Sequence, residues 1–367
     1  MPPPLPLRIS LLGSFLLVFL AAQGCSRRST ESTPAAKGNA PGVDLAVTGI
    51  QEPSGVLRSG SHLYLVGDDD PGSYFEFALN PEEVVENTET RRIPLDPQRL
   101  KRFIISSDDC PNDLEGIAVM ADGRIAVLSE ERRALFDQSG VIAFYGRVLA
   151  EFGTRGVEGV AVQRLPNDSS RVAVLWEGGY PDEDEMPVPL RARCSDTSIP
   201  PFILIHDLAS GESRKRVQES DAERIVILDV PTAPGAEPAG QRFRAPDLVW
   251  HSWKEGGITV QGFIVLLSSG AAATALPGSK EECPKSDRGT PLRYCYKWLQ
   301  RFRLDGSRAG GPYELDQAFP PELRTANWEG MGWYEEGKRL VLTYERSFDS
   351  GSPDLEEAFV MPLPQGW

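Results

Sequence analysis

A glutamate–glycine pair followed by a hydrophobic residue recurs along the chain, at Glu115-Gly116-Ile117, Glu158-Gly159-Val160 and Glu329-Gly330-Met331. Each copy opens an apolar stretch typical of a β-strand, and a turn and a second apolar stretch follow it. The second stretch again ends in an acid, at Glu130, Glu177 and Glu345. In an antiparallel hairpin, the start of the first strand and the end of the second lie at the same end. The repeat therefore predicts two rows of acidic side chains on one face of the fold.

Two weaker copies fit the same frame, one from Ser54 to Asp68 and the other from Asp247 to Ser268. The units then begin near residues 52, 113, 156, 245 and 327. A self-similar all-β unit of roughly 40 to 50 residues is typical of a β-propeller, in which each repeat is one four-stranded blade. Five blades are visible, and a sixth follows if Glu219–Arg244 holds a further degenerate unit. A two-sheet sandwich is the alternative, but it gives no reason for an acid at the same place in each unit.

In a propeller the first strand of each blade lines the central channel. The glutamate–glycine positions would then form an inner ring of Ser54, Glu115, Glu158, Asp247 and Glu329. The ends of the second strands would form a neighbouring ring of Asp68, Glu130, Glu177, Ser268 and Glu345. The glycine allows the backbone a close approach near the crowded axis.

Carboxylates that converge in a channel repel one another, so they must be protonated, paired with arginine or lysine, or neutralised by a cation. Oxygen ligands without His or Cys favour a hard cation, Ca²⁺ before Mg²⁺. The predicted metal ligands are Glu115, Glu158, Glu329, Asp247, Glu130, Glu177 and Glu345. The alternative is structural: each acid caps backbone amides of the next blade or pairs with a nearby arginine, for which the candidates are Arg132, Arg133, Arg155 and Arg346.

The N-terminal residues are typical of an export signal. An apolar run from Ile9 to Ala22 is too short for an ordinary membrane span and ends in AAQGC, which resembles a bacterial lipobox. We therefore expect a signal peptide at 1–24, a lipidated Cys25 with a flexible tether to residue 43, and one propeller domain at 44–367. This predicts a monomer anchored by lipid in a bacterial cell envelope, on the periplasmic side or the cell surface. A plain signal peptide that happens to precede a cysteine is the alternative.

Charge and cysteine content restrict the partners and the metal chemistry. The formal net charge of −15 argues against nucleic acid or an anionic lipid surface, since both require a basic face. Four cysteines besides Cys25 in an exported chain predict two disulfides. Proximity favours Cys283 with Cys295 and Cys110 with Cys194, among three connectivities. No CxxC occurs and the three histidines lie far from the cysteines in sequence, which argues against zinc.

Three segments resemble the SdiA-regulated (YjiK-like) proteins of bacteria: EPSGV at 52–56, DLEGIAVMADGRIAVLSEERR at 113–133 and GVEGVAV at 156–162. The resemblance implies an exported or membrane-tethered propeller, with calcium in some members. NWEGMGW at 327–333 also resembles a phytase-like family described as having esterase-like activity. Little between residues 181 and 325 resembles either family.

Three classes of function remain open from the sequence. We favour a lipid-anchored binding propeller whose acidic channel holds a cation and a polar ligand or protein partner. The phytase-like resemblance implies the alternative, a calcium-dependent hydrolase of phosphate or carboxyl esters. A module that binds proteins through loop insertions is the third. The sequence holds no GxSxG nucleophile motif and no phosphate-binding loop, so no catalytic residue is named.

Overall fold

The computed structural model describes residues 50, 52–68, 70–105, 111–146, 156–178, 200–217, 224–231, 243–268, 297–315, 318–319, 326–345 and 357–367. The chain divides into Met1–Leu45, none of which is described, and a compact unit Ala46–Trp367. The residues of the predicted lipidation and disulfides lie outside the description, namely Cys25, Cys110, Cys194, Cys283 and Cys295. Within the described ranges, no helix is both long enough and apolar enough to cross a membrane.

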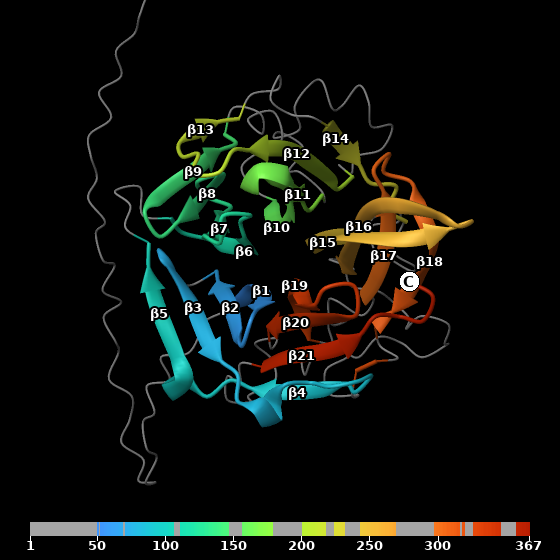
Figure 1. Cartoon of the computed structure of the whole chain (residues 1–367), viewed down its shortest axis with the longest axis horizontal. Helices are drawn as coiled ribbons and strands as arrows, with labels where there is room; N and C mark the ends of the chain where they lie inside the picture. The colour runs from blue at the N-terminus through green and yellow to red at the C-terminus, as the bar shows by residue number, and fades with distance from the viewer. Residues whose placement is uncertain are drawn as a thin grey trace, which may run out of the picture. The chain divides into compact units, whose positions relative to one another are not determined.

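Five β-sheets stand around a common centre and form a five-bladed β-propeller (Figure 1). The first blade consists of β1 (Pro53–Ser59), β2 (His62–Gly67), β3 (Ser73–Ala78) and β5 (Leu100–Ile104). The second has β6 (Leu114–Val119), β7 (Ile125–Ser129), β8 (Ala134–Asp137) and β9 (Gly140–Phe144), with the short β13 (Lys215–Arg216) added in parallel. The third has β10 (Val157–Arg164), β11 (Ser170–Trp176), β12 (Phe202–Leu208) and β14 (Arg224–Ile227).

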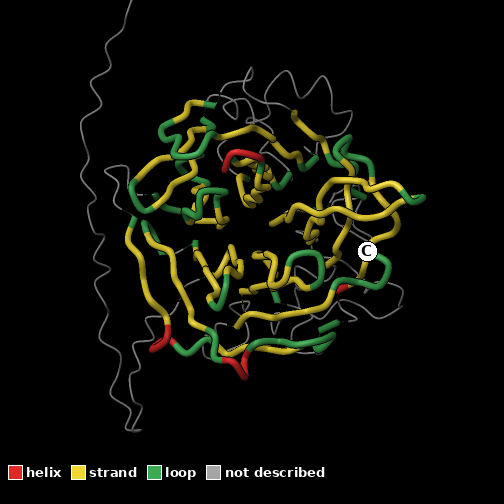
Figure 2. The backbone as a smooth tube through the Cα atoms, in the orientation of Figure 1, coloured by secondary structure: helices red, strands yellow, loops and turns green. Residues whose placement is uncertain are grey.

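The fourth blade consists of β15 (Arg244–Glu255), β16 (Ile258–Ser268), β17 (Lys297–Arg303) and β18 (Arg308–Glu314). The fifth has β19 (Asn327–Glu335), β20 (Arg339–Glu345), β21 (Glu357–Pro362) and β4 (Arg91–Pro94). The prediction of an all-β propeller is confirmed, and the sandwich alternative is wrong. The described part of Glu219–Arg244 supplies β14 to the third blade instead of a sixth blade. Helical structure in the described residues consists of short 3₁₀ turns, including Pro81–Glu83, Pro97–Arg99 and Pro166–Asp168 (Figure 2).

The ring closes by an exchange between the first and last blades. In the sequence β4 lies between β3 and β5, yet it pairs with β21 as the outermost strand of the fifth blade. Arg92 on β4 forms an ion pair with Glu357 on β21, and the hydroxyl of Tyr344 donates to the same carboxylate at 3.0 Å. A strand that follows the first three strands of the N-terminal blade in sequence therefore completes the C-terminal blade.

Hydrophobic side chains fill each of the five boundaries between neighbouring blades. Five buried clusters are present, and each draws its members from two adjacent blades. Because successive side chains of a strand point to opposite faces, one strand serves two clusters. Leu248 on β15 packs against the third blade and the next residue, Val249, packs against the fifth.

The repeated glycine marks the place where the inner strands come closest. A Cβ on Gly116 would lie 2.9 Å from the backbone nitrogen of Val160, in the next blade. A Cβ on Gly55 would lie 2.8 Å from the backbone oxygen of Glu115. Real Cβ atoms do not approach backbone atoms this closely, so β1 and β6 require glycine at this level. In β10 and β19, a Cβ on Gly159 or Gly330 would lie closer than 3.0 Å to the side chain of Asp247 or Thr343. This is why the repeat joins a glycine to each glutamate.

Each of these four inner strands bulges at the residue before the glycine. The pairing skips Ser54, Glu115, Glu158 and Glu329, and it resumes at the glycine that follows. At a bulge, the side chain of the extra residue does not follow the alternation between the two faces of the sheet. The bulge and the glycine together place the repeated side chain at the end of the channel where the first strands begin.

The fourth blade departs from this pattern. Asp247 pairs with Leu266, as Gly159 pairs with Leu175 in the third blade. Asp247 therefore occupies the glycine position, and not the glutamate position predicted from the repeat. The two differ because the irregularity in β15 spans two residues, Ala245 and Pro246, instead of one.

Candidate functional site

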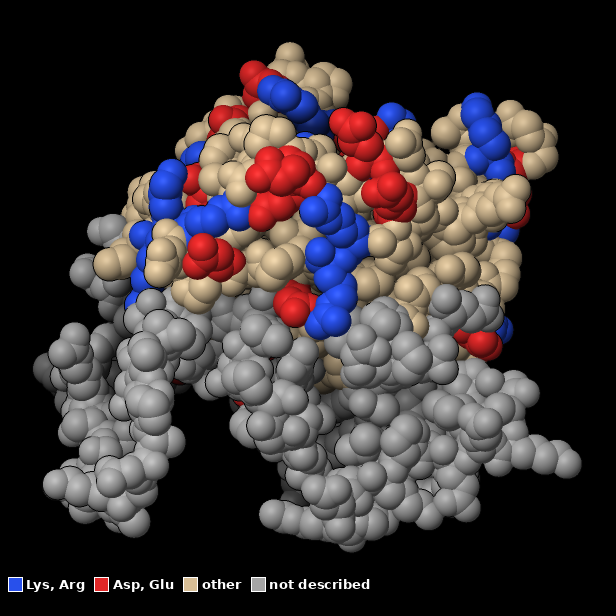
Figure 3. Space-filling model, turned by 90° about the horizontal axis from the view of Figure 1, so that it is seen from below, with Lys and Arg blue, Asp and Glu red and all other residues tan. Residues whose placement is uncertain are grey.

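A cavity of about 650 Å³ opens at the end of the channel where the first strands begin and the second strands end. We call it the acidic cavity, because its walls carry nine carboxylates and two guanidinium groups. The lining residues are Glu52, Asp68, Asp113, Glu115, Glu130, Glu131, Arg133, Glu158, Glu177, Arg244 and Glu329. On the outer face in Figure 3, by contrast, acidic and basic side chains are interspersed. Acidic groups thus predominate in the cavity wall, whereas the face in Figure 3 carries both signs of charge side by side.

The structure brings together five of the seven residues that the sequence predicted as metal ligands. Glu115, Glu158 and Glu329 come from first strands, and Glu130 and Glu177 follow second strands. Asp247 does not line the acidic cavity, in keeping with its place at the glycine position. The side chain of Glu345 lies outside the described part of the structure.

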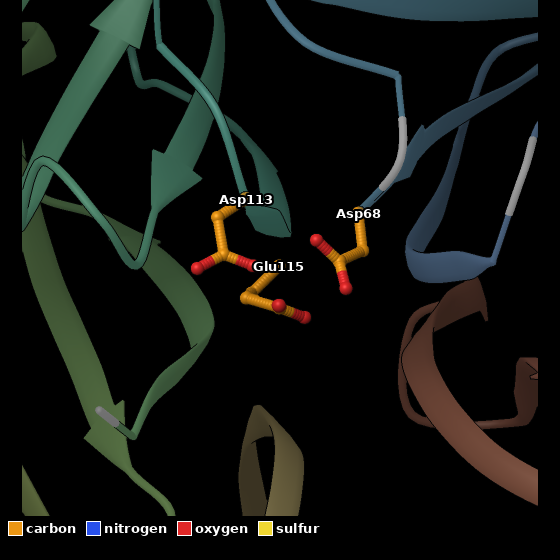
Figure 4. Close-up of side chains that lie close together, drawn as sticks. All are labelled: Asp68, Asp113 and Glu115. Carbon is orange, nitrogen blue, oxygen red and sulfur yellow. The ribbon is translucent and has the colours of Figure 1, made fainter. Parts of the chain in front are cut away.

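Three carboxylates form the tightest group in the cavity. One oxygen from each of Asp68, Asp113 and Glu115 lies within 4.8 Å of the other two. Figure 4 shows the three groups turned toward one another, with Asp68 from the first blade facing the two residues of the second. We call this group the three-carboxylate cluster.

Two members of the cluster are absent from the ligands predicted from the sequence: Asp68 was placed only in the ring of second-strand ends, and Asp113 was placed in neither ring. Asp113 lies two residues before Glu115 and adopts a left-handed conformation, with φ of 54°. Glu52 and Gly156 stand at the equivalent positions of the first and third blades, with φ of 50° and 107°. In each blade the backbone oxygen of this residue accepts the N–H that follows the second strand, as Asp113 does from Glu130 at 2.8 Å. The D-x-E-G spacing in the sequence could have identified Asp113, since Asp tolerates this backbone conformation better than most residues.

Burial and mutual repulsion act together on these carboxyls. Glu115 is only 8% exposed, and burial raises the pKa of its carboxyl well above the usual range. The negative charges of Glu329 and Asp68 raise this pKa further. Burial likewise raises the pKa of Glu158 strongly, and neighbouring Glu177 adds to the effect. The pKa of Asp113 is raised chiefly by burial as well. Without a cation, the cavity therefore retains protons that these carboxyls would lose in water.

Three of the predicted residues join neighbouring blades. Glu130 of the second blade accepts the backbone N–H of Gly156 in the third. Glu177 of the third blade pairs with Arg244 of the fourth. Asp247 of the fourth blade accepts the N–H of Met331 in the fifth at 2.7 Å, and burial raises its pKa well above the usual range. These three residues therefore make the contacts of the structural alternative, in which an acid binds a backbone amide of the next blade or pairs with an arginine.

The three-carboxylate cluster suits a hard cation of the size of calcium. Ca²⁺ binds oxygen at 2.3–2.6 Å, so two oxygens on one ion lie at most about 5 Å apart. The separations within the cluster fall inside that limit without any movement. The donor set is all oxygen, and Ca²⁺ accepts irregular carboxylate sets that Mg²⁺ does not. A bound cation would neutralise charge that the cavity otherwise balances with protons.

Comparison with solved structures gives distant matches, and three of them have 11–13% sequence identity to this chain. A structure reported as a gluconolactonase has 13% identity and a TM-score of 0.32, covering 86% of this chain and 90% of that chain. A thermostable family-43 glycoside hydrolase has 11% identity and a TM-score of 0.38, covering 87% and 91%. The PQQ-bound aldose sugar dehydrogenase from Streptomyces coelicolor has 12% identity and a TM-score of 0.24, covering 76% and 100%.

At this level of similarity, neither substrates nor chemistry transfer from those proteins to this chain. No protein-family model and no curated protein matches it. The resemblance to SdiA-regulated proteins is therefore not confirmed, and the function must be argued from the cavity itself.

Proposed function

We propose that the chain is a cation-binding β-propeller of the cell envelope, with Ca²⁺ held in the acidic cavity by Asp68, Asp113 and Glu115. The observation that carries the proposal is the approach of these three carboxylates within 4.8 Å in a cavity that holds nine acids. Glu158 and Glu329 line the same cavity and are proposed as further ligands, and Glu329 also accepts a hydrogen bond from the side-chain amide of Asn327. Glu130, Glu177 and Asp247 are assigned to contacts between blades first, because each already binds a group on the next blade.

The size of the cavity supports a role beyond a structural ion. About 650 Å³ falls within the range of small-molecule sites and far exceeds the volume of one cation. A polar ligand or a segment of a partner protein could therefore reach the bound ion from the open end. The lipid anchor at Cys25 and the disulfides Cys110–Cys194 and Cys283–Cys295 belong to the same proposal, as expectations from the sequence.

Two arginines in the wall favour one alternative, a calcium-dependent hydrolase of phosphate or carboxyl esters. The rings predicted from sequence held no basic group, whereas Arg133 and Arg244 both line the acidic cavity. A guanidinium beside a cation could orient an anionic ester. Arg244 is paired with Glu177, and the Glu130 carboxylate acts on Arg133, so both guanidinium groups already face an acid in the cavity wall.

Equilibrium dialysis of the purified protein against ⁴⁵Ca²⁺ tests the proposal directly. We expect one site per chain, and we expect its loss in Asp113→Asn and Glu115→Gln. Glu86→Gln, an exposed glutamate outside the cavity, is the matched control and should leave binding intact. Wild-type binding no greater than that of the two cavity variants would contradict the proposal. The hydrolase alternative requires, in addition, phosphomonoester or carboxyl-ester turnover that is lost in chelator.

A further inference from the structure

A second cavity, of about 590 Å³, lies at the opposite end of the channel. We call it the apolar cavity. Its walls come from the later residues of the first strands, beyond the glycine level, and include Leu57, Ile117, Val119, Val162, Met331 and Trp333. All five turns that join first to second strands at this end are within the described residues. No carboxylate of the acidic cavity lines it.

The aromatic part of the wall is held in a fixed orientation. The indole N–H of Trp333 donates to the backbone oxygen of Trp250 at 3.0 Å. The indole N–H of Trp250 donates in turn to the backbone oxygen of Ala161 at 3.2 Å. Trp333 remains partly exposed, as do Val119 and Val162. The cavity thus presents a flat ring and branched aliphatic side chains without the need to rearrange.

The charge at the mouth differs in sign from that of the acidic cavity. Arg58 and Arg164 line the apolar cavity with one exposed acid, Glu336. Arg164 already pairs with Asp168 at 2.6 Å. Arg58 donates from Nε to the backbone oxygen of Gly60 at 2.8 Å and lies 4.4 Å above the ring of Tyr334. Among the described residues Arg58 makes no ion pair, although its charge acts on the Glu335 carboxylate together with those of Lys338 and Arg339. The outer guanidinium nitrogens of Arg58 are the groups that would receive an anion.

A buried polar atom adds to these features. His251 lines the cavity and is 8% exposed, and its Nε2 has no hydrogen-bond partner within the described part of the chain. Burial and the nearby Arg301 lower the pKa of His251 to about 4, so the ring is neutral near pH 7. A buried polar atom without a partner is uncommon and is costly to leave unsatisfied. Pockets of this size, mainly apolar with a few polar groups, are typical of sites for small organic molecules.

We propose that the apolar cavity is a second binding site, which takes a small organic anion with a flat apolar body. The body lies against Trp333 and the aliphatic wall, and the anionic group lies at Arg58. This site is independent of the cation in the acidic cavity, because the two share no lining residue.

The test uses two fluorescent probes with nearly the same body and different charge. 1-Anilinonaphthalene-8-sulfonate carries one sulfonate, and N-phenyl-1-naphthylamine carries none. We expect the folded wild-type protein to bind the sulfonate probe at one site, equally with calcium and with chelator. Arg58→Gln should weaken binding of the sulfonate probe about tenfold, the loss of one charge-assisted contact, and should leave the uncharged probe unchanged. Arg216→Gln, an exposed arginine outside the cavity, is the matched control.

Variants whose larger side chains fill the apolar cavity provide a second test of the proposal. Val162→Phe should abolish binding of both probes, and Val119→Phe supplies the same test from the second blade if the first variant does not fold. Ile104→Phe, on the outer strand β5, should leave binding unchanged, since Ile104 is 72% exposed and far from the cavity wall. Binding that survives both filling variants, or that Arg58→Gln does not weaken, would overturn the proposal, as would the absence of any binding to the wild type. Calcium dialysis is unaffected by these outcomes.

Discussion

The carboxylate of Asp247 accepts the backbone N–H of Met331 at 2.7 Å across the boundary between the fourth and fifth blades. Its other oxygen accepts the N–H of Leu248, also at 2.7 Å. A Cβ on Gly159 would lie 2.6 Å from that oxygen, so the third blade leaves room for the side chain. In β15, Asp247 stands between Arg244, which lines the acidic cavity, and Leu248, which lines the apolar one. We infer that Asp247 secures the fourth blade at the level that separates the two cavities.

Replacing Asp247 with Ala should lower the free energy of unfolding without changing the calcium response. Two buried N–H groups would lose their acceptor, at a cost of roughly 1–3 kcal/mol each. Denaturant unfolding in calcium and in chelator measures both effects, and Asp247→Asn, which keeps one acceptor oxygen, should be milder. An Asp247 variant whose stability in chelator is unchanged, but is no longer increased by calcium, would show that Asp247 is a calcium ligand.

The metal-free protein should lose stability as the pH rises from acid toward neutral. The pKa values of Glu115 and Glu158 are raised well above the ordinary range in the folded state. The folded chain then holds protons that the unfolded chain releases, so stability is present below the ordinary glutamate pKa and declines as the pH passes the raised values. Thermal melts in chelator across this pH range measure the decline. Calcium should oppose it, with its largest effect at the higher pH, and a melting temperature that rises steadily with pH in chelator would contradict this account.

Much of the fold follows from the repeat because its period, glycine and turn residues agree with one another. The five first strands begin at Pro53, Leu114, Val157, Arg244 and Asn327, close to the predicted starts of the units. The exchange of β4 could not be predicted, since Arg91–Pro94 follows the first blade in sequence and finds its partner β21 near the C-terminus. Local pattern carries no information on such long-range pairing.

The candidate site was predicted in outline, but Asp68 and Asp113 were left out of the predicted ligands and Asp247 was wrongly included. The repeat placed Glu115, Glu158 and Glu329 at one end of the channel, and they line one cavity. Asp113 was missed because its side chain is directed by a left-handed backbone residue, not by strand alternation. Asp247 was misaligned because apolar pattern alone does not distinguish a one-residue irregularity from a two-residue one.

Closure of the propeller by β4 should dominate the stability of the fifth blade. Ile93 on β4 is 1% exposed and packs in the cluster between the fifth and first blades. Ile93→Ala should cost roughly 2–5 kcal/mol of unfolding free energy, as for other large-to-small core changes. Arg91→Ala, on the same strand but exposed, should cost far less. Equal stability of the two variants in denaturant would argue against the exchange.

Lipidation at Cys25 is a prediction from the sequence. Cys25→Ser should abolish incorporation of labelled acyl chains and move the protein from the membrane fraction to the soluble fraction. The measurement is fractionation with mass analysis of the mature N-terminus. A wild-type protein that is already soluble and begins beyond Cys25 would contradict the anchor.

Calcium-dependent thermal stability of Glu115→Gln combined with Glu158→Gln tests the central claim most directly. A ligand that binds only the folded state stabilises it by about 2.7 kcal/mol at one hundred times its dissociation constant. We therefore expect millimolar calcium to raise the melting temperature of the wild-type protein at neutral pH, and the double variant to show no such rise. In chelator the double variant should be at least as stable as the wild type, because the buried Glu115 and the half-buried Glu158 no longer repel the neighbouring carboxylates. A double variant that is destabilised equally in calcium and in chelator would show that these glutamates serve only the closure of the propeller.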